Sequence, residues 1–177
     1  MKYIFDLDDT LIQSTTLNND AYNYALEKFD YPRIDTKERL TREKLKFIPE
    51  FKLEKIIEEK QRYFTSEWLP YRVIFNSELI KKIKEYGQEN CYLWTKASKE
   101  RVEPILKYCN LRVLFSKVIY DNKVTLNTSI KKLKSVAHVK EFIIYENNSE
   151  FFVGAKVLEI DSIRTYSFDV TGYLICA

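Results

Sequence analysis

The sequence predicts a three-layer α/β fold, in which a parallel sheet is covered by helices on both faces. After residue 76 the chain alternates between short β-prone runs and amphipathic helical runs, which is the pattern of consecutive strand–helix units. The first β-prone run, residues 2–5, stops abruptly at acidic residues, as a buried parallel strand does at its carboxyl end. A long and mostly helical segment then follows before the second strand, which indicates an insertion.

The expected strands are the short apolar runs at residues 2–5, 91–94, 113–115 (which 118–120 could extend), 141–145 and 155–160. Helices are expected at residues 21–29 after a cap at Asn19 or Asp20, through most of 35–68, at 79–86 before Gly87, after Ser98, and at 128–137. The tail near Gly172 is expected to form a hairpin or an edge strand. Together these elements predict a Rossmann-like core domain of residues 1–15 and 77–177 with a helical insertion of residues 16–76.

The composition narrows the class of protein. The chain has 177 residues, of which 45% are hydrophobic and 31% charged, so it can bury a core. Its net charge of +3 is spread among acidic residues, which argues against a nucleic-acid partner. No run approaches the roughly 20 apolar residues of a membrane helix. Three widely spaced cysteines and the absence of a signal-peptide pattern favour free thiols in a reducing cytoplasm. The composition leaves the oligomeric state open.

An acidic cluster follows the first strand directly. In open α/β sheets ligands bind beyond the carboxyl ends of the strands, which is where Asp6, Asp8 and Asp9 fall. Asp6 and Asp8 are two residues apart and can project toward one site, where crowded carboxylates require a cation or a shared proton. Magnesium suits such oxygen ligands. One carboxylate could attack phosphorus while the other protonates the leaving oxygen. The alternative is a turn at Asp8 and Asp9 followed by a cap at Thr10.

Residues 3–11, Tyr-Ile-Phe-Asp-Leu-Asp-Asp-Thr-Leu, resemble the first motif of the haloacid dehalogenase superfamily. The resemblance implies that Asp6 is the nucleophile and a Mg²⁺ ligand. It implies that Asp8 is the general acid/base and binds the metal through its main-chain carbonyl. An aspartate at the second position indicates a phosphatase or phosphomutase rather than a dehalogenase. The insertion then resembles a helical cap, in whose core we expect the aromatic residues Tyr22, Phe29, Phe51, Tyr63 and Trp68.

The later motifs of the superfamily are expected on later strands. Residues 92–95 are similar to the second motif, so the Thr95 hydroxyl would donate a hydrogen bond to a phosphoryl oxygen. The third motif is a lysine ahead of the helix before the fourth strand. Lys123 fits this position, and Lys117 is the alternative. The charge of Lys123 would offset that of Asp6 and of the incoming phosphate.

The fourth motif departs from the pattern of the superfamily. Glu146 and Glu150 stand where the resemblance implies metal-binding aspartates, and Asn147 could supply a neutral oxygen ligand. Tyr145 replaces the usual glycine before the first acid. Because Mg²⁺ demands near-ideal octahedral geometry, the additional methylene of glutamate is expected to shift or weaken the site.

The resemblance implies a Mg²⁺-dependent phosphohydrolase that acts on a small phosphomonoester, such as a nucleotide, a sugar phosphate or another metabolite phosphate. The reaction would pass through an aspartyl phosphate on Asp6. A polynucleotide end is disfavoured by the low net charge and by the expected closure of the cap. Two alternatives remain. One is phosphoryl transfer as in a phosphomutase. The other is a catalytically weakened module that binds a phosphorylated ligand or protein, which the glutamate at position 146 would explain.

Overall fold

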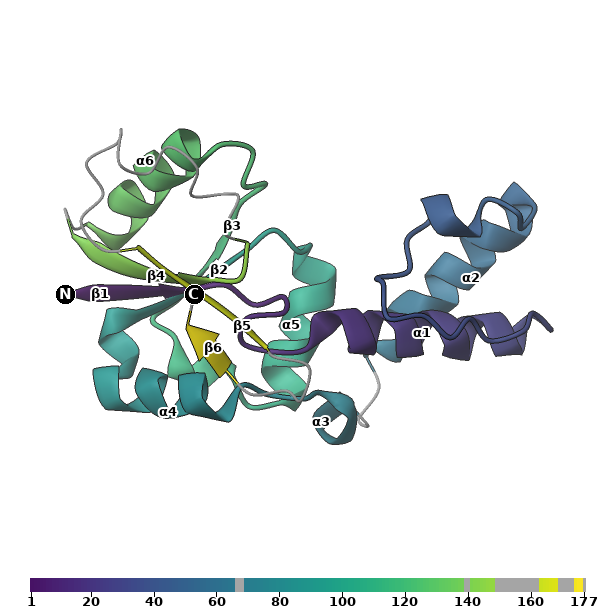
Figure 1. Cartoon of the computed structure of the whole chain (residues 1–177), viewed down its shortest axis with the longest axis horizontal. Helices are drawn as coiled ribbons and strands as arrows, with labels where there is room; N and C mark the ends of the chain where they lie inside the picture. The colour runs from purple at the N-terminus through teal and green to yellow at the C-terminus, as the bar shows by residue number, and fades with distance from the viewer. Residues whose placement is uncertain (66–68, 139–140, 149–162, 169–173, 177) are drawn as a thin grey trace. The chain divides into compact units, whose positions relative to one another are not determined.

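The computed structural model describes residues 1–65, 69–138, 141–148, 163–168 and 174–176 (Figure 1). The chain forms two compact units. The core unit comprises Met1–Gln13, Ile74–Lys99 and Leu111–Ala177, and the helical unit comprises Ser14–Val73 and Glu100–Asn110. The domain boundaries expected at residues 15 and 77 stay a prediction. Among the described residues, no helix combines the length and the apolar character needed to cross a membrane.

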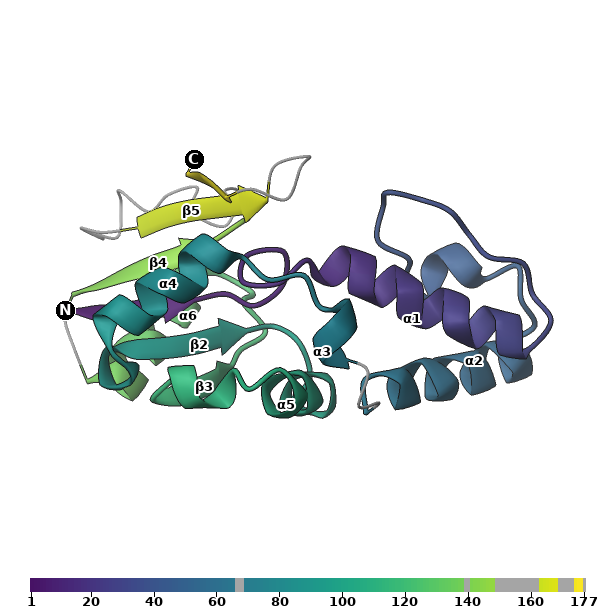
Figure 2. The same cartoon turned by 90° about the horizontal axis from the view of Figure 1, so that it is seen from below.

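A six-stranded sheet in the order β3-β2-β1-β4-β5-β6 forms the centre of the core unit. Its strands are β1 (Lys2–Phe5), β2 (Cys91–Thr95), β3 (Lys117–Tyr120), β4 (Phe142–Glu146), β5 (Ile163–Phe168) and β6 (Leu174–Cys176). The pairs from β3 through β5 are parallel, and β6 is antiparallel to β5 (Figure 2). The predicted α/β fold with a parallel sheet is therefore confirmed.

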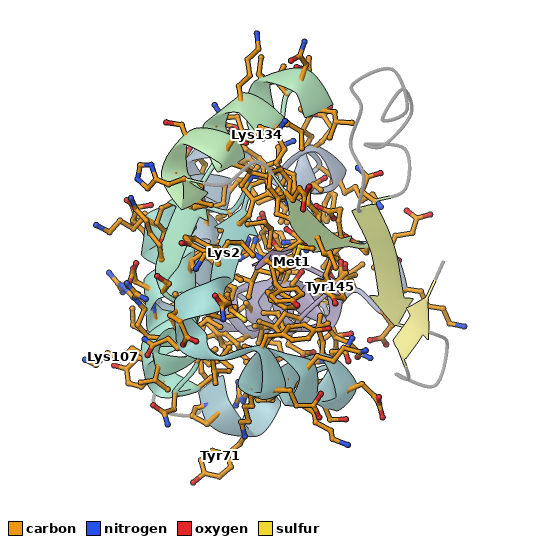
Figure 3. All side chains as sticks on the ribbon, turned by 90° about the vertical axis from the view of Figure 1, so that its left-hand side faces the viewer. Met1, Lys2, Tyr71, Lys107, Lys134 and Tyr145 are labelled. Atoms are coloured by element: carbon orange, nitrogen blue, oxygen red, sulfur yellow. The ribbon has the colours of Figure 1, made fainter. Side chains whose placement is uncertain are left out.

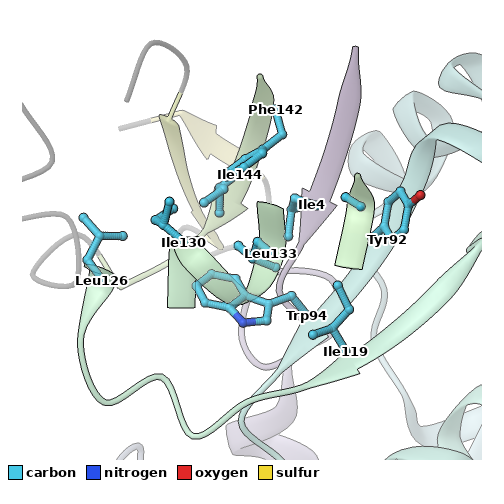
Figure 4. Packing of buried hydrophobic residues seen from close by; sticks show 10 residues of the cluster. Ile4, Tyr92, Trp94, Ile119, Leu126, Ile130, Leu133, Phe142 and Ile144 are labelled. Carbon is cyan, nitrogen blue, oxygen red and sulfur yellow. The ribbon is translucent and has the colours of Figure 1, made fainter. Parts of the chain in front are cut away.

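Helices cover both faces of this sheet and give the three layers (Figure 1). Alternate strand residues point to opposite faces. Ile4, Trp94 and Ile144 pack against α6 (Leu126–Ala137), where Leu133 is fully buried (Figure 4). The opposite face is covered by α4 (Ser77–Tyr86). Both helices contribute buried apolar side chains, which stabilise the unit on the two sides of the central strand β1.

Both ends of α4 are capped, and the cap at Gly87 is the one that the sequence predicted. The Asn76 side chain accepts a hydrogen bond from the Leu79 amide at 3.1 Å, which satisfies one of the free donors of the first turn. The helix ends at Gly87, whose φ of 83° is the left-handed conformation that glycine adopts without a steric cost. A 3₁₀ turn, η2 (Gln88–Asn90), then leads directly into β2.

Tyr145 stands where the resemblance implies glycine, and its ring lies between the sheet and α4. The ring stacks on Phe5 with centroids 4.7 Å apart, and its hydroxyl lies 2.8 Å from that of Tyr86. Tyr86 in turn stacks on Tyr3 at 3.7 Å. Figure 3 shows Tyr145 in the interior, whereas Lys134 projects from α6 into solvent. The aromatic side chain therefore contributes to the core of this unit.

The helical unit is organised around two helices, α1 (Ser14–Lys28) and α2 (Glu50–Tyr63). The shorter elements are η1 (Glu43–Leu45), α3 (Leu69–Arg72) and most of α5 (Lys99–Tyr108). A cluster of buried side chains joins α1, α2 and the loop between them: Tyr22, Ala25, Leu26, Leu40, Leu45, Ile48, Leu53 and Ile56. Lys28 and Glu59 form an ion pair at the edge of this cluster.

Two sequence predictions for the helical unit are wrong. The first helix begins at Ser14 rather than near residue 21, so the expected caps Asn19 and Asp20 lie inside it. The side-chain amides of Asn18 and Asn19 donate to the carbonyls of Leu40 and Glu38, at 2.9 and 2.8 Å, and hold the following loop against the helix. The helical pattern expected through most of 35–68 is interrupted, since residues before α2 form that loop and the short turn η1.

Other predictions require correction at single segments. Residues 113–115 are not a strand, because Arg112–Leu114 form the 3₁₀ turn η3 and β3 begins only at Lys117. The strand expected at 155–160 lies outside the described residues, as does Trp68. Among the aromatic residues expected in the cap core, Tyr22 and Tyr63 are buried and Phe29 packs against the cluster of the helical unit, whereas Phe51 is 65% exposed.

Lys60 is a destabilising cation within the helical unit. Burial lowers its pKa to about 8, and the charges of Arg101 and Arg39 add to this effect. Its ammonium lies 4.1 Å from the centre of the Tyr22 ring, which offsets part of the cost of burial. Because the pKa in the folded state lies below the ordinary value of 10.5, the folded protein binds fewer protons than the unfolded chain between these two pH values. Stability should therefore rise with pH through this window.

We predict that Lys60→Met raises the free energy of unfolding at pH 7 by about 1–2 kcal/mol, because it removes a buried charge and keeps most of the side-chain volume. Urea denaturation of wild type and variant at pH 7 and pH 10 measures the effect, which should shrink at the higher pH. Lys55→Met, an exposed substitution on the same helix, is the control and should change stability by less than about 0.5 kcal/mol. An equal gain at both pH values would contradict the prediction.

Candidate active site

A polar cavity of about 510 Å³ lies in the core unit, at the carboxyl ends of the parallel strands. Its lining consists of side chains that end or follow strands: Asp6, Asp8, Asp9, Lys96, Lys123, Glu146, Asn147 and Asn148. Parallel strands all end at one edge of a sheet, so segments far apart in the sequence meet there. The predicted residues Asp6, Asp8, Lys123 and Glu146 are thus brought together around one cavity.

The pairing of β1 with β4 places two acidic residues side by side. Phe5 is opposite Tyr145 in the ladder, and the Asp6 amide donates to the Tyr145 carbonyl at 2.8 Å. Asp6 and Glu146, the next residues on each strand, are 4% and 3% exposed. The Lys123 ammonium bridges them, with Nζ 2.5 Å from Asp6 Oδ1 and 2.6 Å from Glu146 Oε2. One cation therefore serves two buried carboxylates.

The site carries more negative than positive charge, and the pKa of Asp6 is raised. Burial raises that pKa to about 8, and the charges of Glu146 and Asp8 add to the rise despite the opposing effect of Lys123. Burial alone would lower the pKa of Lys123, but Asp6 and Glu146 outweigh it and the pKa is raised. Lys123 is therefore charged at neutral pH. The site favours the uptake of one further positive charge, either a proton or a metal cation.

The second oxygen of Glu146 is directed to its own loop. Oε1 accepts hydrogen bonds from the amides of Asn147 and Asn148, at 3.0 and 3.2 Å. The Asn147 side chain accepts a hydrogen bond from the Thr10 hydroxyl at 3.3 Å, which ties this loop to the end of the first motif. The carboxylate of Glu146 is thus held in one orientation by three donors, one of which is Lys123.

The first motif forms a tight turn after β1. The amides of Leu11 and Ile12 both donate to the Leu7 carbonyl at 3.1 Å, and Asp9 has a φ of 54°. Aspartate tolerates this left-handed conformation better than most residues do. Asp8 and Asp9 remain partly exposed on the wall of the cavity, whereas Asp6 lies at its buried end.

The other predicted residues are placed differently. Thr95 is fully buried at the end of β2 and is absent from the described lining of the cavity; its hydroxyl accepts from the Ala97 amide at 3.1 Å. Lys117 begins β3 opposite Tyr92, at the far end of the strand from the cavity. Glu150 lies outside the described residues. Sequence reasoning did not select Lys96 or Asn148, although both follow strand ends closely, which is the signal that would have found them.

The donor atoms of the cavity fit Mg²⁺ by their chemistry. No group of three or more histidine, cysteine, aspartate or glutamate side chains in the described part of the chain is arranged to hold a metal ion. Mg²⁺, however, is commonly held by one or two carboxylates, with waters and substrate phosphate completing its shell. Asp6 and Glu146 supply two such carboxylates, both of which contact Lys123, and Asn147 lies in the same lining.

Comparison with known proteins supports the fold. No protein-family model matches the sequence, and no curated protein matches it either. Among solved structures, the chain resembles a subfamily IA hydrolase of the haloacid dehalogenase superfamily from Geobacter sulfurreducens, with a TM-score of 0.66, 17% identity, and coverage of 90% of this chain and 83% of that one. It also resembles a predicted phosphoglycolate phosphatase from Haemophilus somnus, with a TM-score of 0.67, 16% identity and coverage of 97% and 86%.

A third structure of the same fold is a candidate β-phosphoglucomutase from Thermotoga maritima, with a TM-score of 0.61, 19% identity and coverage of 92% and 84%. These likenesses extend over nearly the whole chain. The protein therefore has the fold of the haloacid dehalogenase superfamily of hydrolases, as the first motif implied.

We predict that Lys123→Met destabilises the protein by about 3 kcal/mol at pH 7, because it leaves two buried carboxylates without their cation. Urea denaturation measures this loss. The double variant Lys123→Met/Glu146→Gln should recover part of it, since only one carboxylate is then left. Lys96→Met removes an exposed cation from the same cavity and should cost less than about 0.5 kcal/mol. Equal losses in the two lysine variants would contradict the proposed balance of charge.

Proposed function

We propose that this chain is a Mg²⁺-dependent phosphohydrolase acting on a small phosphomonoester, with Asp6 as the nucleophile. The observation that carries the proposal is the buried Asp6 carboxylate, held by Lys123 beside Glu146 at the carboxyl edge of the sheet. Its position and its partners match those that the first, third and fourth motifs imply. A carboxylate fixed in this way needs little further ordering before it attacks phosphorus.

In the first step an Asp6 oxygen attacks phosphorus in line with the ester oxygen. The bond between phosphorus and the ester oxygen breaks as Asp8 donates a proton to the departing alcohol, which leaves an aspartyl phosphate on Asp6. In the second step Asp8 accepts a proton from water as that water attacks phosphorus. The bond between phosphorus and the Asp6 oxygen breaks, which restores the Asp6 carboxylate and releases inorganic phosphate. Asp8 suits both roles because it lies on the wall of the same cavity and remains partly exposed to solvent.

Cations in the site balance the charge of the phosphoryl group. Lys123, which is paired with Asp6 and Glu146 in the structure, offsets the charge that gathers near phosphorus, and Lys96 lies in the lining of the same cavity. Asp6, the Asp8 carbonyl, Glu146 and the Asn147 side chain would hold Mg²⁺, and Glu150 is a further candidate. When bound, Mg²⁺ neutralises phosphoryl oxygens. The Thr95 hydroxyl accepts from the Ala97 amide, which leaves its own O–H to donate to a phosphoryl oxygen.

The size of the site supports a small substrate. A cavity of about 510 Å³ lies within the range of ordinary small-molecule sites. The resemblance to a predicted phosphoglycolate phosphatase agrees with this class of substrate, and the candidate β-phosphoglucomutase represents the alternative of phosphoryl transfer. Product analysis separates the two reactions, since a hydrolase releases inorganic phosphate and a mutase retains it in an organic ester.

We predict that Asp6→Asn abolishes phosphate release, with a loss of at least about 10³-fold, because an amide is not a competent nucleophile. Release from a panel of phosphomonoesters with Mg²⁺ measures the loss. Asp9→Asn is the matched control, since Asp9 belongs to the same turn and asparagine tolerates its φ of 54°. This control should keep activity within about tenfold. A wild type that binds phosphate esters but releases none would instead identify a binding module.

The affinity for Mg²⁺ should rise with pH up to about pH 8. Without metal, Asp6 has a pKa of about 8, so the cation must displace a proton below that pH. Calorimetric titration at pH 6.5, 7.5 and 8.5, in buffers with different heats of ionisation, measures both the affinity and the proton released. We expect about one proton to be released at the lowest pH and little release at the highest. A dissociation constant that is independent of pH would contradict this linkage.

A further inference from the structure

Lys123 makes a third contact that the reaction described above does not use. Its Nζ atom lies 3.9 Å from the centre of the Trp94 ring, well within the distance at which an ammonium and an indole face attract one another. Trp94 is completely buried at the end of β2, among the apolar side chains beneath α6 (Figure 4). The buried indole therefore packs against the ammonium, which also contacts the carboxylates of Asp6 and Glu146.

The indole is itself held by Asp121. Trp94 Nε1 donates to Asp121 Oδ2 at 3.1 Å, and the Ser129 hydroxyl donates to the same oxygen at 2.6 Å. Lys132 lies 3.7 Å from the other oxygen. Burial alone would raise the pKa of Asp121, but these partners outweigh it and the pKa is lowered. Asp121 is therefore ionised, and Trp94 cannot rotate without losing a charge-assisted hydrogen bond.

Asp121 also acts on the backbone that carries Lys123. Its amide donates to the Thr95 carbonyl at 3.0 Å, which ties the loop after β3 to the end of β2. Its side chain accepts a hydrogen bond from the Lys123 amide. Lys123 has a φ of 50°, a left-handed conformation that a lysine rarely adopts without support from its surroundings. One carboxylate thus holds both the ring and the backbone that determine where the ammonium lies.

We propose that Trp94 and Asp121 are positioning residues for Lys123. Asp121 orients the indole and stabilises the turn at Lys123, and the indole face confines the ammonium to the point between Asp6 and Glu146. The inference rests on the proposed function, because it assigns the two residues to the placement of the cation that serves Asp6. Neither residue belongs to the described lining of the cavity, and the contacts of both with Lys123 are the route by which we expect them to act on the reaction.

Steady-state kinetics with the best substrate of the phosphomonoester panel test the effect on the reaction. Trp94→Leu removes the ring face and should lower kcat about tenfold with little change in KM, whereas Trp94→Phe keeps a ring face and should stay within about threefold. Asp121→Ala should lower kcat to a similar degree, and Asp121→Asn, which keeps an acceptor for the indole N–H, should restore most of it. Tyr92→Leu is the matched control, because it removes a buried ring from the same strand and the same cluster without touching Lys123.

Fluorescence tests the contact itself without any turnover. The chain contains two tryptophans, so Trp94 is the single emitter in a Trp68→Phe background. A charge close to an indole face alters its excited state, and Lys123→Met should therefore change the emission of the folded protein. Lys96→Met removes another cation from the same cavity and should leave the emission unchanged.

The outcomes separate this proposal from the proposed function. Loss of kcat in Trp94→Leu and Asp121→Ala, rescue by the conservative variants and an emission change in Lys123→Met would together support the positioning role. Folded Trp94→Leu and Asp121→Ala proteins that match Tyr92→Leu in kcat would overturn it, as would unchanged emission in Lys123→Met. If the wild type releases no phosphate from any ester, the proposed function fails, and the emission result alone then decides whether Trp94 holds Lys123.

Discussion

Two buried carboxylates on adjacent strands are the constraint on which the rest of the site depends. The parallel pairing of β1 and β4 puts Asp6 beside Glu146, and both are almost inaccessible to water. Such a pair is costly unless a cation lies between them. The chain supplies that cation from the loop after β3, which is separated from β4 by two strands in the sheet. Lys123 has a positive φ of 50° in this loop.

The main architecture could be predicted from sequence because it rests on strong local signals. The apolar runs of β1, β2 and β4 end at polar residues, so their limits were predicted to within one residue. The failures have long-range causes. Asn19 looks like a helix cap in sequence, but its side-chain amide donates to the carbonyl of Glu38 in the loop after the helix. Residues 113–115 are apolar enough for a strand, yet they close a 3₁₀ turn that leads into β3.

The composition of the site was predictable to the extent that topology alone determines it. Asp6, Lys123 and Glu146 meet because residues that follow the carboxyl ends of parallel strands share one edge of the sheet. Their order along the chain, together with the motifs that the resemblance implied, was enough to group them. The roles of Trp94 and Asp121 could not be read in the same way. A tryptophan before a threonine at a strand end looks like any core residue, and only the three-dimensional path of the loop places an ammonium over its ring.

The structure shows contacts of Glu146 that the sequence did not predict. From the sequence it is a departure that lengthens a metal-binding side chain by one methylene. In the structure one of its oxygens accepts from two amides of its own loop and the other from Lys123, so the longer side chain is fully engaged and held in one orientation. A carboxylate used in this way is well placed to neutralise the lysine and to order the loop. Metal binding would then compete with Lys123 for Oε2 of Glu146. A metal ion held by few protein oxygens would need phosphoryl oxygens of the substrate to complete its coordination shell.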